Sequence, residues 1–131
     1  MKLVVDASVV AALYFPDERP PPEFVEQMTE TETIAPYLFW YEIRATALKK
    51  ERQRILAAAA VDEALRQIRD LPIVLRQMTD EVAVVGLARR HALSFYDASY
   101  LALALSERAR LATLDSRLAA AARAEGVLLE P

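Results

Sequence analysis

The sequence contains no cysteine and only one histidine, His91. Disulfide bonds, thiol catalysis and zinc–thiolate sites are therefore excluded, and a chain without cysteine suits the cytoplasm. A single histidine also leaves no Ser–His triad and no histidine-rich metal site. His91 lies at the basic end of a predicted helix, where the helix dipole favours positive charge, and this explains it better than catalysis does.

Glycine is almost as scarce, since Gly86 and Gly126 are the only two. Neither belongs to a glycine-rich phosphate loop, so nucleotide binding of the dinucleotide or P-loop kind is excluded. No apolar run approaches the ~20 residues that cross a membrane. The apolar N-terminus lacks a basic flank and includes Asp6, so we expect neither a membrane span nor a signal peptide.

The composition predicts a folded chain with a sizeable core. Of 131 residues, 54% are hydrophobic and 27% are charged, which predicts one globular domain over residues 1–131. The net charge of −3 does not by itself indicate a nucleic-acid binder. If four carboxylates were gathered in a metal site, the rest of the chain would be slightly positive and compatible with a phosphate-bearing substrate.

Short apolar segments alternate with segments of helical pattern along the whole chain. This alternation predicts an α/β fold with a central parallel β-sheet flanked by α-helices, in three layers. The predicted strands are residues 3–5, 33–35, 73–75, 111–114 and 127–129. The predicted helices are residues 7–14, 23–28, 37–52, 55–71, 80–91 after a Thr79 cap, 98–109 after an opening at 94–97, and 116–125 before Gly126.

Two predicted strands end on an acid that directly precedes a helix. Asp6 follows the strand at 3–5, and Asp115 follows the strand at 111–114. In parallel α/β sheets ligands bind outside the carboxyl ends of the strands, so both acids are expected at that edge. The alternative is that each acid is simply the N-cap of the helix after it.

Two further acids lie in helical segments without a cation at helical spacing. Glu42 has Leu38 and Thr46 as such neighbours, and Asp97 has Tyr100. An unpaired acid on an apolar face is costly unless something neutralises it. Alternatively, Glu42 turns to solvent, and Asp97 belongs to a capping-box variant.

Taken together, the four acids fit four separate caps poorly. A shared divalent cation would neutralise them, and Mg²⁺ and Mn²⁺ prefer oxygen ligands. Ser8 and Ser116 each follow an acid, and either hydroxyl could hydrogen-bond a ligating carboxylate or serve as a local cap.

The basic stretch at 49–54 is interpreted as a solvated helix end, with a phosphate contact as the alternative. The aromatic residues at 14–15 and 39–41 are interpreted as core or dimer surface, with base stacking as a minor alternative.

The same segments resemble, in order, the four motifs of the PIN domain family. The four segments are 3–9, Pro36 with Glu42 and Leu48, 96–104, and 111–118 followed by Ala121 and 126–127. At this length the chain looks most like the VapC ribonuclease toxins of toxin–antitoxin pairs. The resemblance implies a PIN fold and an endoribonuclease that depends on Mg²⁺ or Mn²⁺. It also implies a homodimer, an RNA substrate and a VapB-like antitoxin that covers the cleft.

The resemblance also assigns roles to residues. Asp6, Glu42, Asp97 and Asp115 match the four catalytic and metal-binding acids, and Thr113 matches the hydroxyl residue before the fourth acid. Metal held by these acids would activate water for attack on an RNA phosphodiester. Some relatives carry another Asp or Asn two residues after the fourth acid, where this chain has Arg117, so the resemblance implies a four-acid site and leaves occupancy by a second metal open.

Alternative functions remain on the sequence alone. One is a housekeeping PIN-domain nuclease of RNA processing, and another is a non-catalytic PIN-like module whose acids bind a partner's Arg or Lys. A haloacid-dehalogenase-type phosphotransfer domain is set aside, because it needs a second Asp where this chain has Ser8. The helices around residues 23–70 are the candidate dimer surface.

Overall fold

The computed structural model describes residues 1–130. Its sheet contains four parallel strands in the order β3-β2-β1-β4. The strands are β1 (Lys2–Val5), β2 (Glu32–Pro36), β3 (Ile73–Arg76) and β4 (Arg110–Ala112). Val4 and Val5 of the interior strand β1 are fully buried, as expected for a parallel strand covered on both faces. The predicted parallel α/β architecture is confirmed.

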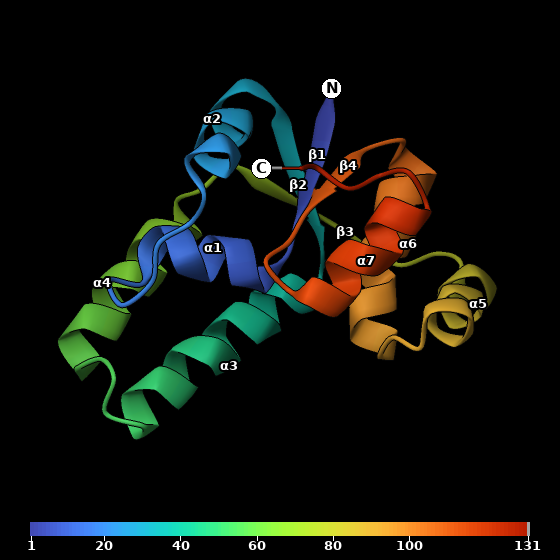
Figure 1. Cartoon of the computed structure of the whole chain (residues 1–131). Coiled ribbons are helices and arrows are strands. Elements are labelled where there is room, and N and C mark those ends of the chain that lie inside the picture. The colour runs from blue at the N-terminus through green and yellow to red at the C-terminus, as the bar shows by residue number, and fades with distance from the viewer. Residues whose placement is uncertain (131) are drawn as a thin grey trace.

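Helices cover both faces of this sheet (Figure 1). One side carries α1 (Ala7–Tyr14), α2 (Pro22–Glu30), α3 (Leu38–Arg52) and α4 (Ala58–Arg69), and the other carries α5 (Glu81–His91), α6 (Phe95–Glu107) and α7 (Ser116–Ala124). Helix α6 packs directly against β1 and β2. Its buried Ala98 and Ala104 have small side chains that permit this close approach. Within residues 1–130, no helix is both long enough and apolar enough to span a membrane.

Several predicted helix boundaries were wrong, each for a local reason. The N-cap of α5 is Asp80 and not Thr79, because the Asp80 carboxylate accepts a hydrogen bond of 3.0 Å from the backbone N–H of Ala83. Helix α4 begins at Ala58 and not near residue 55, because Ala57 has an extended backbone with φ of −72° and ψ of 155°. Helix α6 already begins at Phe95, so Asp97 lies in its first turn.

The C-terminal strands are shorter than predicted. Strand β4 ends at Ala112, because the next residues turn to form the cap of α7. The predicted strand at 127–129 is reduced to one parallel bridge between Leu111 and Leu128. Gly126 ends α7 as predicted, with a positive φ of 77° that glycine adopts without strain.

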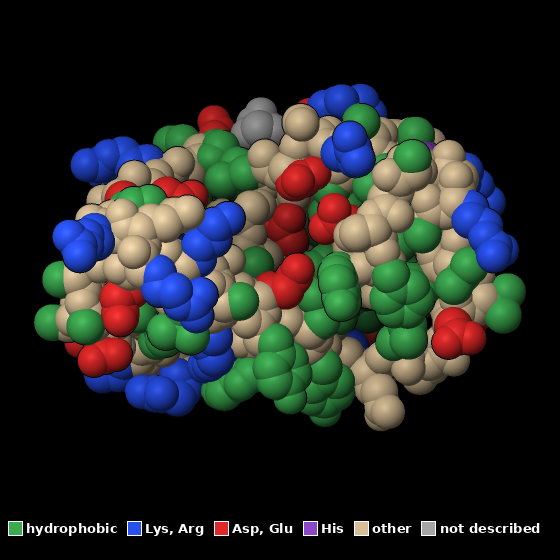
Figure 2. All heavy atoms as spheres, turned by 90° about the horizontal axis from the view of Figure 1, so that it is seen from below, with side chains coloured by type: hydrophobic (Ala, Val, Ile, Leu, Met, Phe, Trp, Pro, Cys, Tyr) green, Lys and Arg blue, Asp and Glu red, His purple; other side chains and the backbone are tan. Residues whose placement is uncertain are grey.

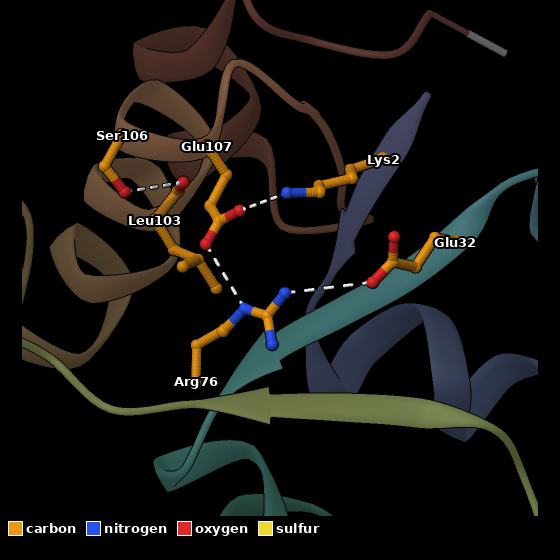
Figure 3. A network of polar contacts seen from close by, with 6 residues as sticks. All are labelled: Lys2, Glu32, Arg76, Leu103, Ser106 and Glu107. Carbon is orange, nitrogen blue, oxygen red and sulfur yellow. Dashed lines mark hydrogen bonds and ion pairs between the residues drawn. The ribbon is translucent and has the colours of Figure 1, made fainter.

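An ion network joins three strands to α6 near the amino ends of β1 and β2 (Figure 3). Lys2 Nζ lies 2.6 Å from Glu107 Oε1, and Arg76 Nε donates to Glu107 Oε2 at 3.2 Å. Arg76 ends β3, but its side chain extends toward the amino end of β2, where its guanidinium lies 3.8 Å from a carboxylate oxygen of Glu32. We call these four residues the amino-edge network. Every acid in it has a cationic partner.

Candidate active site

Asp6 lies where β1 ends and α1 begins, and it is 6% exposed. Its Oδ1 accepts hydrogen bonds from the backbone N–H of Val9 at 3.2 Å and from Ser8 Oγ at 2.6 Å. Its Oδ2 accepts a hydrogen bond from the hydroxyl of Thr113. Asp6 is therefore a true N-cap, and it also lies at the carboxyl edge of the sheet, so its two interpretations are compatible.

Thr113 and Ser8 connect the carboxyl ends of β1 and β4. The Thr113 hydroxyl donates to Asp6 and accepts a 3.0 Å hydrogen bond from the backbone N–H of Asp115. Ser8 Oγ likewise accepts from the backbone N–H of Leu114 at 3.0 Å. The Asp115 carboxylate caps α7 by accepting from the N–H of Leu118 at 2.8 Å. The hydroxyls thus hold the segments that carry two of the acids in register.

Glu42 lies in the second turn of α3, which follows the carboxyl end of β2. The Tyr100 hydroxyl of α6 donates to Glu42 Oε1 at 2.6 Å, and Tyr100 is 1% exposed. Burial and the neighbouring Glu42 carboxylate both raise the pKa of Tyr100, so this hydroxyl stays a donor. Tyr100 was not predicted as a site residue. The available signal was a tyrosine directly before the apolar run at 101–105, because a buried tyrosine needs a hydrogen-bond partner.

Asp97 lies in the first turn of α6, beside the same sheet edge. The Ser94 side chain accepts a 3.0 Å hydrogen bond from the backbone N–H of Asp97, which is half of the predicted capping box. The Asp97 carboxylate itself is partly buried and has no ion-pair partner among residues 1–130. Burial, followed by the charge of Asp115, raises the pKa of Asp97, and the nearby charge of Arg117 lowers it by a smaller amount.

The four acids share one electrostatic environment. Burial raises the pKa of Asp6, Glu42 and Asp97, and in each case a neighbouring site carboxylate raises it further. The charge of Asp97 acts on Asp6 and Glu42, and the charge of Asp115 acts on Asp97. Seen from the carboxyl edge of the sheet, acidic side chains gather in a hollow at the centre of this face (Figure 2).

This donor set is made of carboxylate oxygens, which suit Mg²⁺ and Mn²⁺. As they stand, however, no three His, Cys, Asp or Glu side chains of residues 1–130 are grouped closely enough to hold an ion. In this arrangement the carboxylates of Asp6 and Asp115 cap helices, and that of Glu42 accepts a hydrogen bond from Tyr100. The assignment of the four acids as metal ligands stays a prediction.

Of the other predicted site residues, some contact the acids and others do not. Ser8 and Thr113 contact Asp6, whereas Ser116 is exposed and its hydroxyl makes no hydrogen bond within the part of the chain that the structure describes. In the basic stretch, Lys50 is paired with Asp17 and Glu18, both at 2.6 Å. Lys50 is therefore already neutralised, which disfavours its use as a phosphate contact.

A four-stranded parallel sheet with helices on both faces and a carboxylate-lined hollow at its carboxyl edge defines a class of α/β proteins that bind ligands at this edge. Within that class, residues 3–124 match the family model of the PIN domain. The chain belongs to the PIN domain family.

Named relatives agree with this membership. The chain is 35% identical over 124 residues to ribonuclease VapC3 of Pyrobaculum aerophilum, covering 91% of this chain and 93% of that protein. The crystal structure of PAE2754 from the same organism superposes with a TM-score of 0.73 at 25% identity, covering 92% of this chain and 79% of the other. The crystal structure of FitAcB from Neisseria gonorrhoeae has a TM-score of 0.61 at 15% identity over 92% and 93% of the two chains, a likeness of fold.

Proposed function

We propose that this protein is a metal-dependent endoribonuclease and the toxin of a VapBC-type toxin–antitoxin pair. The observation that carries the proposal is the 35% identity to ribonuclease VapC3 over 91% of the chain. The position of Asp6, Glu42, Asp97 and Asp115 around one sheet edge supports it. Cytoplasmic location, a homodimer and inhibition by a VapB-like antitoxin belong to the same proposal.

The four acids fit a divalent cation by the chemistry of their donors. Three of them have raised pKa values, and none has an ion-pair partner within residues 1–130. A bound Mg²⁺ or Mn²⁺ would offset their repulsion, lower the pKa of water and stabilise negative charge on a phosphodiester. A non-catalytic module that binds a partner's Arg or Lys would also offset this charge, so metal binding separates the two functions.

The chain's own residues would hold these carboxylates ionised and oriented. The Ser8 and Thr113 hydroxyls donate to Asp6, and both lower its pKa against the effect of burial. The Tyr100 hydroxyl does the same for Glu42. Hydrogen bonds of this kind fix the orientation of metal-ligating groups. The protein thus supplies geometry and electrostatics, and no side chain has to form a covalent intermediate.

The test is cleavage of RNA by the purified protein and arrest of growth on its expression. The wild-type protein should cleave RNA with added Mg²⁺ or Mn²⁺, lose activity in a chelator, and arrest growth unless the antitoxin is co-expressed. Asp6→Asn should remove both effects. Asp62→Asn is the matched control, because Asp62 is an exposed acid of α4.

Two results would change the proposal. Full activity in chelator, or in Asp6→Asn, would refute the metal site. Cleavage without growth arrest would favour the housekeeping nuclease over the toxin.

A further inference from the structure

An exposed apolar side chain directly precedes three of the four site acids. Tyr41 before Glu42 is 73% exposed, Tyr96 before Asp97 is 61% exposed, and Leu114 before Asp115 is 40% exposed. We call these three residues the apolar rim. Single exposed apolar side chains are common, but here they recur at one place, and two of them are aromatic rings.

The three segments that carry the rim are tied together beside the acids. The hydrogen bond from Tyr100 to Glu42 joins α6 to α3, which carry Tyr96 and Tyr41. The hydrogen bond from the Leu114 N–H to Ser8 Oγ holds the third member beside Asp6. In Figure 2 hydrophobic side chains lie next to the acidic hollow on the same face, and Lys and Arg side chains gather on the side that carries α3 and α4.

We infer that Tyr41 and Tyr96 are positioning residues that stack against RNA bases next to the phosphodiester presented to the acids. The inference rests on the proposed ribonuclease function. A phosphodiester in the hollow has a nucleoside on each side, and each base has a flat face that an aromatic ring can cover. Tyr41 and Tyr96 are exposed and directly precede two acids on different helices, so each ring is available to a base held next to those acids.

The charge pattern indicates that RNA needs a source of affinity other than electrostatic attraction at the hollow. The hollow is acidic and repels phosphate when no cation is bound, and Lys50 is neutralised by Asp17 and Glu18. Electrostatic attraction, which usually supplies most of the affinity for nucleic acid, is therefore weak at the hollow itself. Stacking supplies affinity without positive charge. The Lys and Arg side chains on the α3 and α4 side are placed to follow the backbone beyond it (Figure 2).

The first experiment measures binding of RNA by fluorescence anisotropy, in an Asp97→Asn background that prevents cleavage. The probe is a labelled adenosine oligoribonucleotide. Tyr41→Ala and Tyr96→Ala should each weaken its binding roughly 5- to 100-fold, as loss of one stacked base does. Tyr41→Phe and Tyr96→Phe keep the ring and should restore binding. Val82→Ala is the control, because Val82 is an 82% exposed apolar residue of α5.

The second experiment repeats the measurement with an abasic ribose–phosphate chain of the same length and charge. The alanine and parent proteins should bind this chain equally, because it has no base to stack. Equal binding of the adenosine oligonucleotide by parent and alanine variants would overturn the inference and assign the rim to a protein partner. Equal losses for both probes would also overturn it, because the rings would then act on the fold or the backbone.

Cleavage by proteins that retain Asp97 separates this inference from the proposed function. Ring-dependent binding with no cleavage by the wild type would support base stacking and refute the nuclease. Cleavage with KM unchanged in both alanine variants would overturn base stacking and leave the nuclease in place. A raised KM with little change in kcat, reversed by phenylalanine, supports both.

Discussion

Acidic side chains occur in two contrasting settings in this molecule. In the amino-edge network, Glu107 accepts from Lys2 and Arg76, and these hydrogen bonds and charges lower its pKa (Figure 3). At the carboxyl edge, burial and the charge of Asp115 raise the pKa of Asp97. The first acid is held by cations, whereas the second is held beside another acid.

The two settings have different consequences for the stability of the fold. A paired surface acid contributes little to stability, but it does not oppose folding. A partly buried acid beside like charges destabilises the folded state whenever it is ionised. Such residues are retained where function needs them, so the contrast itself singles out the carboxyl edge as the candidate active site.

The largest expected effect follows from removing the charge of Asp97. Asp97→Asn should lower the rate of RNA cleavage by at least about 100-fold, because a proposed metal ligand is lost. The metal-free variant should be as stable as the wild type or slightly more stable, by on the order of 1 kcal/mol. Single-turnover cleavage and thermal unfolding in chelator measure the two effects. Retained cleavage would show that the reaction does not need Asp97. Clear destabilisation would show that Asp97 serves the fold.

Removing the hydroxyl of Thr113 should have the next largest effect. Thr113→Val leaves one Asp6 oxygen and the Asp115 N–H without their partner. We expect metal affinity to fall about 10- to 100-fold and the free energy of unfolding to fall by about 1–3 kcal/mol. Thr113→Ser keeps the hydroxyl and should recover most of both. Titration with Mn²⁺ and chemical denaturation provide the measurements, and a valine variant with wild-type affinity would contradict the role of Thr113.

The pH dependence of stability should also reflect the unpaired state of Asp97. In the unfolded chain Asp97 loses its proton near its ordinary pKa of 3.8, whereas the folded protein keeps the proton to higher pH. Proton binding by Asp97 therefore favours the folded state at low pH, and this contribution to stability is lost as pH rises through the raised pKa. In chelator, the stability of Asp97→Asn relative to wild type should accordingly increase as pH rises above about 4. A gap that is constant with pH would contradict the raised pKa.

Addition of Mg²⁺ at neutral pH should reverse the difference in stability between Asp97→Asn and the wild type. Binding to the folded state alone adds about 2.7 kcal/mol when Mg²⁺ is at a hundred times its Kd. The wild type should gain this stability and Asp97→Asn should gain much less. Equal gains in the two proteins would place the cation elsewhere.

The smallest effect is expected in the amino-edge network. Glu107→Gln removes the charge that pairs with Lys2 and Arg76. The free energy of unfolding should fall by less than about 1 kcal/mol, because the ion pairs are reached by solvent, and the loss should shrink at high salt. RNA cleavage should be unchanged. A loss of cleavage would show that the two edges are coupled.

The fold was predictable from sequence because its signals are local. Apolar strands such as Leu3–Val5, and helix ends such as Gly126, are set by nearby residues. Errors arose where two local signals competed. Thr79 and Asp80 are both good caps, and only the folded geometry shows that Asp80 makes the hydrogen bond. The segment at 127–129 has the composition of a strand but pairs only through Leu128.

The site was predictable in part. Asp6 and Asp115 stand out in sequence because each ends a strand, and Glu42 and Asp97 because they lack cations at helical spacing. In the structure none of the four has an ion-pair partner within residues 1–130. Tyr100 was missed because its contact with Glu42 spans 58 positions of the chain. Sequence periodicity reports neighbours on one element, and it carries no signal for a hydrogen bond between α6 and α3.

The hydrogen bond between Thr113 and Asp6 spans 107 positions of the chain, and β1 pairs with β4 through residues of similarly distant origin. During synthesis β1 therefore emerges well before β4, and this side of β1 stays unpaired until β4 has also been made. Asp6 acquires its last partner only when residue 113 has left the ribosome. Shorter chains carry the first three acids without the element that joins them to the fourth, so the order of synthesis itself delays assembly of the site until the segment at 113–115 is available.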